Sequence, residues 1–160
     1  MINVRSGTPF SSGMVSAGFW IGLTVGRFTL GWITGRFGEK LMVSIYLLLA
    51  TGLELIFWLV PQFYVSAVSV ALLGYFIGPL FPSAMVVETR LLPARLHVSA
   101  VGFATAVGGS GAAIWPFAVG AVASSKGVET MQPIVLGLLV GQLGLWLLLP
   151  EVPQEHVHES

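Results

Sequence analysis

Two ionisable side chains lie inside long apolar stretches, where a charged group needs a partner or a function. Arg27 follows an uncharged run over residues 6–26, and Glu54 lies within the apolar run 41–60. In a bilayer a charged residue costs about 2.5–3.5 kcal/mol on insertion scales, so it faces protein or water. Arg27 is therefore a candidate for a polar pathway that meets an anionic or hydroxylated solute. A structural ion pair, or a side chain that reaches to the interface, is the alternative.

Glu54 is a candidate proton site, because the charged form of a carboxylate is disfavoured away from water. A neutral or hydrated side chain near the lipid headgroups is the alternative. Counted along their helices at about 1.5 Å per residue, Glu54 and Arg27 differ in depth by roughly 9 Å. A direct pair between them therefore requires a long reach by the arginine.

The other polar residues show no arrangement that an enzyme would need. The sequence has no Ser-His-Asp order, no paired carboxylates and no glycine loop that would cradle a phosphate. It contains no cysteine, and its three histidines are spread between a loop (His97) and the C-terminal tail (His156 and His158). We therefore predict no enzymatic activity, no metal site and no cofactor.

The composition is that of a protein whose solvent is lipid. Only 9% of the 160 residues are charged, 55% are apolar and the mean hydropathy is +0.88. Soluble domains carry about 25% charged residues, which cover their surface. The net charge of zero gives no basic excess for nucleic acid. The lipid bilayer is thus the first predicted partner.

Charges and turn residues divide the chain into membrane-length segments, since a crossing needs about 20 apolar residues. The sequence predicts an all-α polytopic bundle of five transmembrane helices, over residues 14–34, 41–60, 63–88, 98–123 and 131–150. The loop 35–40, a tight turn at Pro61-Gln62 and the loop 89–97 separate the first four. Residues 1–13 are predicted as an outer loop, 14–150 as the transmembrane bundle and 151–160 as an acidic cytoplasmic tail.

The basic residues predict the orientation. If the helices alternate, the loops 35–40 and 89–97 share one side and hold Arg36, Lys40, Arg90 and Arg95, whereas the opposite side holds Arg5 and Lys126. The positive-inside rule places the first set in the cytoplasm. The N-terminus is then outside and the C-terminus inside, in what we expect to be the plasma membrane.

Small residues recur one turn apart and predict close helix packing. They occur on the first helix (Gly18, Gly22 and Gly26), the third (Gly74 and Gly78), the fifth (Gly137 and Gly141) and, as residues 108–113, on the fourth. The fourth helix, with Trp115-Pro116 just beyond its glycines, is predicted to be the most kinked. Pro79 and Pro82 make the third helix the next candidate.

Residues 31–40 (GWITGRFGEK) resemble the signature loop of the major facilitator superfamily. Gly31, Arg36, Gly38 and Lys40 match that loop, Gly35 stands in place of its aspartate and Glu39 in place of one basic residue. Gly26-Arg27-Phe28, residues 78–82 (GPLFP), Leu91-Leu92-Pro93, residues 108–111 and Trp115-Pro116 extend the resemblance. Together they are similar to the C-terminal half of fungal permeases of the fucose-permease-like branch, over about residues 7–150.

The resemblance implies that the five helices are the family's eighth to twelfth, in a fold of two halves with six helices each. The chain would then be a fragment or truncated product that lacks the N-terminal half and the seventh helix. That missing half is an expected partner, because the substrate site of such permeases lies between the halves.

Two functions follow as hypotheses. In the first, the chain belongs to a secondary transporter that moves a small solute, with or without a coupled proton, by alternating access. Arg27, Tyr75 and Trp115 are then expected in the solute pathway, and Gly31, Gly35, Arg36, Gly38 and Lys40 in the gating loop. For Tyr75, which lies beside Gly74 and Gly78, packing is the alternative. In the second, the chain is a membrane scaffold that acts only by helix packing.

Overall fold

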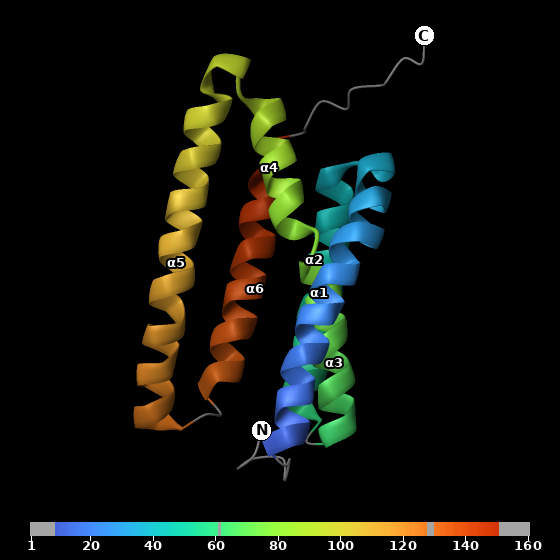
Figure 1. Ribbon diagram of the computed structural model, residues 1–160, viewed down its shortest axis with the longest axis vertical. Coiled ribbons are helices and arrows are strands. Elements are labelled where there is room, and N and C mark those ends of the chain that lie inside the picture. Colours follow the sequence, from blue (N-terminus) through green and yellow to red (C-terminus); the bar gives the residue numbers. More distant parts are fainter. Residues whose placement is uncertain (1–8, 61, 128–129, 151–160) are drawn as a thin grey trace.

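The computed structural model of the chain is a bundle of α-helices (Figure 1). It describes residues 9–60, 62–127 and 130–150, among which no strand occurs. The helices are α1 (Pro9–Phe37), α2 (Glu39–Leu59), α3 (Phe63–Ile77), α4 (Leu80–Leu91), α5 (His97–Lys126) and α6 (Met131–Leu148), with a short 3-10 helix η1 (Ala94–Leu96) before α5. The predicted all-α membrane bundle is confirmed.

Among the described residues, four stretches are long and apolar enough to cross a membrane, and they match four of the five predicted spans. They are Glu39–Leu59, Phe63–Leu91, Ala94–Lys126 and Met131–Leu148. The fifth, α1, has sufficient length with 29 residues but is less apolar, because it carries Arg27 and many glycines, serines and threonines. The chain is therefore a multi-pass integral membrane protein.

The first helix is longer than predicted at both ends. It begins at Pro9, so residues 9–13 of the predicted outer loop are helical, and it continues to Phe37. Only Gly38 separates it from α2, with a φ of 96° that L side chains rarely adopt. The predicted loop 35–40 is thus a one-residue turn. Residues 1–8, Pro61 and the predicted tail 151–160 lie outside the described residues.

The helix break falls on the third predicted helix and not on the fourth. Residues 63–88 divide into α3 and α4 at Gly78-Pro79, and α4 leans away from the line of α3 (Figure 1). By contrast, α5 runs unbroken through Pro116. Pro79 and Pro82, three residues apart, remove two helix donors within one turn, whereas Pro116 removes one. The predicted order of kinking was therefore wrong.

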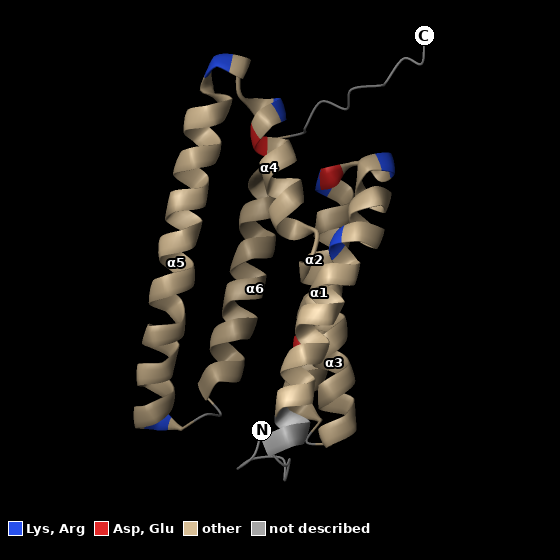
Figure 2. Cartoon of the chain, viewed as in Figure 1, with Lys and Arg blue, Asp and Glu red and all other residues tan. Residues whose placement is uncertain are grey.

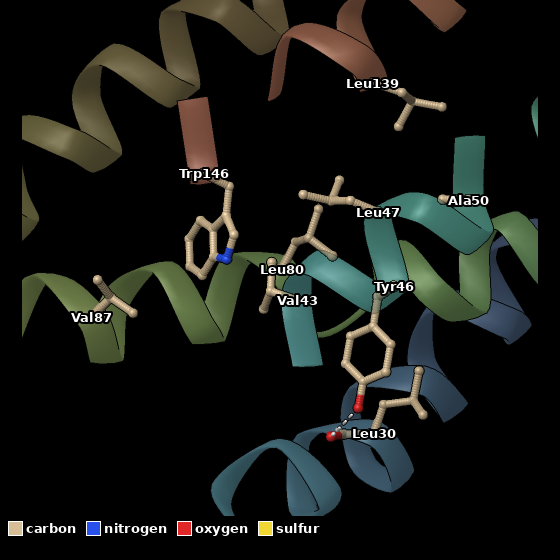
Figure 3. Packing of buried hydrophobic residues seen from close by; sticks show 9 residues of the cluster. All are labelled: Leu30, Val43, Tyr46, Leu47, Ala50, Leu80, Val87, Leu139 and Trp146. Carbon is tan, nitrogen blue, oxygen red and sulfur yellow. Dashed lines mark hydrogen bonds between the residues drawn. The ribbon is translucent and has the colours of Figure 1, made fainter. Parts of the chain in front are cut away.

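The core is centred on α2, which contacts α3 on one side and α6 on another. Its buried residues Val43, Tyr46, Leu47 and Ala50 meet residues of α1, α4 and α6 (Figure 3), namely Leu30, Leu80, Val87, Leu139 and Trp146. The Tyr46 hydroxyl points at α1 and donates to the Leu30 carbonyl over 3.4 Å. Helix α5 stands at the edge of this arrangement, contacts mainly α4 and η1, and has no buried residue.

Candidate solute pathway and gating loop

The glycines of α1 and α3 bring the two backbones into direct contact. A Cβ at Gly22 would collide with the Ala71 carbonyl, and one at Gly26 with the Tyr75 carbonyl. Reciprocally, a Cβ at Gly74 would collide with the Phe19 carbonyl, and one at Gly78 would lie 2.5 Å from the Leu23 carbonyl. The two small-residue stripes seen in the sequence are therefore partners, as helix association in lipid favours.

Arg27 lies at this contact, next to the break between α3 and α4. Its Nε donates to the Gly78 carbonyl over 3.3 Å, while the side chain as a whole remains exposed. The bond occupies one of the five guanidinium N–H groups, so the end-on edge formed by Nη1 and Nη2 stays available to another acceptor.

Tyr75 is brought to the same region. Its hydroxyl lies 2.9 Å from the Thr29 hydroxyl of α1, within hydrogen-bond distance, and its ring packs edge-on against Phe76 at 5.4 Å. Arg27 and Tyr75, which are 48 positions apart, thus contact the same short section of the α1–α3 interface. This section offers a cation and two hydroxyls.

Trp115 is not brought to that section. It lies on α5 and is 51% exposed, and its ring lies near Gly111 of the same helix. A cavity of about 420 Å³ between α4, α5 and α6 is lined mainly by apolar side chains, with Glu88 its charged member. None of Arg27, Tyr75 and Trp115 lines it.

Glu54 is enclosed by protein, with 4% of its surface exposed. It lies five residues before the end of α2, and the buried Ser66 lies three residues after the start of α3, so the two are at a similar depth. The side chain therefore lies between helices, where a carboxylate is shielded by protein at whatever depth it has in the bilayer.

The predicted gating-loop residues lie around the turn between α1 and α2. Gly38 makes the turn and its N–H donates to the Thr34 carbonyl over 2.9 Å. The Arg36 guanidinium stacks 4.2 Å from the centre of the exposed Trp32 ring. A Cβ at Gly31 or Gly35 would have no neighbour within 4 Å, so packing does not require glycine at either position.

Lys40 ties this turn to the end of α6. Its Nζ donates to the Leu149 carbonyl over 2.6 Å, and its own carbonyl accepts from Trp146 Nε1 over 3.2 Å. The sequence placed Lys40 in the loop but gave no indication of α6 as its partner, because the two residues are 109 positions apart.

An ion pair that the sequence reasoning missed joins the same turn to α4. Arg90 Nη1 lies 2.8 Å from Glu39 Oε2, with the glutamate side chain 6% and the arginine side chain 30% exposed. Glu39 was noted only as a departure from the family's loop. Its position directly after Gly38, at the start of an apolar helix, was the available signal that it needed a basic partner.

Most charges lie near the ends of the helices (Figure 2), whereas Arg27 lies within α1 and Glu54 within α2. The Glu39–Arg90 pair confirms that the turn at Gly38 and the segment 89–97 share one end of the bundle. Lys126, the last residue of the 30-residue helix α5, lies at the opposite end. Among the described residues no three His, Asp or Glu side chains are grouped to hold a metal ion.

Comparison with known proteins identifies the family. "Bypass of stop codon protein 6" of Saccharomyces cerevisiae (strain ATCC 204508 / S288c) is 37% identical over 171 residues, which cover 98% of this chain and 33% of that relative. The chain thus spans about a third of the length of this curated relative. No solved structure matches it with significance. Residues 3–160 match the Major Facilitator Superfamily, and the chain belongs to that family.

Proposed function

We propose that the chain works as part of a secondary transporter that moves a small solute across the membrane by alternating access. The observation that carries this proposal is the match of residues 3–160 to a transporter superfamily. The membrane-length helices agree with such a role. No enzymatic activity is proposed.

The chain would supply the C-terminal part of a longer transporter of the fungal, fucose-permease-like type, with its helices equivalent to the eighth to twelfth. Its coverage of 33% of the curated relative supports a partial length. The N-terminal half would provide the opposite wall of the solute pathway. Reading the genomic sequence upstream of Met1 tests this point: further apolar helices in frame are expected, and a stop codon with a promoter would contradict it.

Arg27 would face the solute through its free Nη edge, and Tyr75 and Thr29 would add hydroxyl groups beside it. This arrangement suits a solute with a carboxylate or several hydroxyls, because a guanidinium binds such acceptors through paired N–H groups. Trp115 would join the pathway from α5 in the assembled transporter. Glu54, enclosed within the bundle, would carry a coupled proton.

The orientation proposed from the basic residues places the turn at Gly38 and the segment 89–97 in the cytoplasm, with the plasma membrane as the location. The end of the bundle that holds Arg36, Lys40, Arg90 and Arg95 carries more positive charges than the end at Lys126, which supports this orientation.

Uptake by the full-length transporter tests the function. Vesicles that contain it are supplied with labelled monosaccharides and monocarboxylates, and the Arg27→Ala variant is compared with Arg95→Ala, whose arginine is exposed in η1. We expect Arg27→Ala to reduce uptake about tenfold or more, as for the loss of one charge-assisted hydrogen bond of about 1.5 kcal/mol. Normal uptake by a folded Arg27→Ala variant would remove Arg27 from the pathway. A folded transporter that takes up no solute of either class would instead favour a scaffold.

A further inference from the structure

The break between α3 and α4 leaves backbone carbonyls without their usual helical donors. In an α-helix the carbonyl of one residue accepts from the N–H four residues later. For Tyr75 that residue is Pro79, and for Gly78 it is Pro82. Proline has no N–H, so neither carbonyl has its i+4 donor. A carbonyl left unsatisfied in a membrane costs several kcal/mol and needs another donor.

Arg27 supplies that donor to Gly78. Its Nε lies 3.3 Å from the Gly78 carbonyl, and the backbone N of Arg27 would be 3.0 Å from a Cβ on Gly78. The backbone of α1 is therefore packed directly on the break, with no room for a side chain at position 78. The arginine side chain thereby connects α1 to the point at which α4 begins.

The far end of α4 is held separately. Arg90, in its last turn, binds Glu39 at the start of α2 over 2.8 Å. Helix α4 is thus fixed at its start through Arg27 and at its end through Arg90. If the contact at Arg27 opens, the angle between α3 and α4 can change at Gly78-Pro79, and the Arg90–Glu39 pair must then shift with the last turn of α4 or break.

We propose that Arg27 is a positioning residue that closes a hinge at Gly78-Pro79, and that its Nε–Gly78 hydrogen bond sets the angle between α3 and α4. The role rests on the Nε donor and not on the positive charge. This positioning role does not depend on the transported solute, so it can be tested without a solute. The outcome of that test is therefore separate from the outcome of the uptake experiment.

The experiment measures the distance between spin labels on α3 and α4 by electron paramagnetic resonance. The chain has no native cysteine, so cysteines placed at the exposed Val68 and Leu91 label selectively once any others in the full-length protein are replaced. In wild-type protein in lipid nanodiscs we expect one narrow distance. In Arg27→Ala the population with a changed distance should rise about tenfold, the change for a lost charge-assisted hydrogen bond of about 1.5 kcal/mol.

Two variants separate the donor from the charge. In Arg27→Gln the amide nitrogen occupies the same position along the side chain as Nε, so the neutral variant should keep the narrow distance. In Arg27→Ala/Pro82→Ala the new backbone N–H of residue 82 can donate to the Gly78 carbonyl, so the narrow distance should return. Pro116→Ala, made in the unbroken α5, should not rescue Arg27→Ala.

The proposal is overturned if Arg27→Ala keeps the wild-type distance, if Arg27→Gln opens as far as Arg27→Ala, or if Pro82→Ala fails to restore the double variant. Should Arg27→Ala fail to fold, the comparison of Arg27→Gln and the double variant with wild type still decides the question.

Discussion

At the scale of single residues, glycines on α1 and α3, which have no side chain, let the backbones of these two helices touch. Gly22 and Gly26 of α1 meet carbonyls of α3, and Gly74 and Gly78 of α3 meet carbonyls of α1. Lipid tails are as apolar as leucine, so helices associate in membranes through packing and not through hydrophobic burial. Any side chain at these positions would separate the backbones and weaken that packing.

We predict that Gly26→Leu strongly destabilises the protein. The new Cβ would fall on the Tyr75 carbonyl, a backbone atom that cannot rotate away, so the helices must move apart. Overpacking of this kind costs about 1–3 kcal/mol or more. Thermal unfolding of the purified protein in detergent measures the effect. Gly13→Leu, on the same helix with no atom within 4 Å of its Cβ position, is the control; equal midpoints for the two variants would contradict the observed interlock.

The Glu39–Arg90 pair yields a second prediction at this scale. Arg90→Ala leaves the nearly buried Glu39 carboxylate without its partner, which should lower the unfolding free energy by about 1–3 kcal/mol. The double variant Glu39→Leu/Arg90→Leu should recover part of this loss, because it removes both charges from the interior. Arg95→Ala serves as the exposed control. If Arg90→Ala and Arg95→Ala unfold together in a denaturant titration, the pair contributes nothing.

At the scale of elements, the end of α6 is held by two bonds that involve Lys40. Trp146 Nε1 donates to its carbonyl, and its Nζ donates to Leu149. Trp146→Phe keeps most of the ring but loses one donor, so we expect a loss of about 0.5–1.5 kcal/mol and faster amide exchange in the last turn of α6. Hydrogen–deuterium exchange measures it, with the exposed Leu145→Ala as the comparison. Identical protection in the two variants would show that the indole bond does not hold α6.

The elements themselves could be predicted from sequence, whereas their breaks and partners could not. Apolar runs and the turn at Gly38 are local signals, so the helices lie close to their predicted positions. Whether the helix breaks at Pro79 or at Pro116 depends on contacts with distant residues and not on the local sequence. Pro79 follows Gly78, whose carbonyl has Arg27 within reach, while the exposed α5 has no such contact at Pro116. Contacts such as Arg27–Gly78 and Glu39–Arg90 span 51 positions, and no periodicity encodes them.

At the scale of the whole molecule, the packing is uneven. Helices α1 to α3 form a tight group with α4 and α6 against it, but α5 buries no residue. The sequence indicated which residues favour close packing, including the glycines at 108–111, but not which face each helix presents. Gly26 found a partner on α3, whereas a Cβ on Gly108 or Gly109 would meet nothing within 4 Å. Glycine spacing alone therefore does not determine which glycine-rich face is packed against another helix; the arrangement of the neighbouring helices does.

The two ends of the bundle give the final prediction, which tests the membrane orientation. Arg95 and Lys126 are both exposed and lie at opposite ends of the segment formed by η1 and α5, which has 33 residues. At about 1.5 Å per residue this segment exceeds the roughly 30 Å hydrocarbon core, so the two positions should emerge on different sides. We expect a cysteine at Lys126→Cys to react with a membrane-impermeant maleimide added outside intact cells.

In the same cells, Arg95→Cys should react only after the membrane is permeabilised, because the end with more basic residues faces the cytoplasm. A full-length protein freed of other cysteines serves as the background, and a cytosolic protein with an exposed cysteine controls for leakage. The reverse pattern would leave the fold intact and invert the proposed orientation. Labelling of both positions from outside would instead mean that α5 does not cross the bilayer, because a helix that crosses once has its two ends on opposite sides.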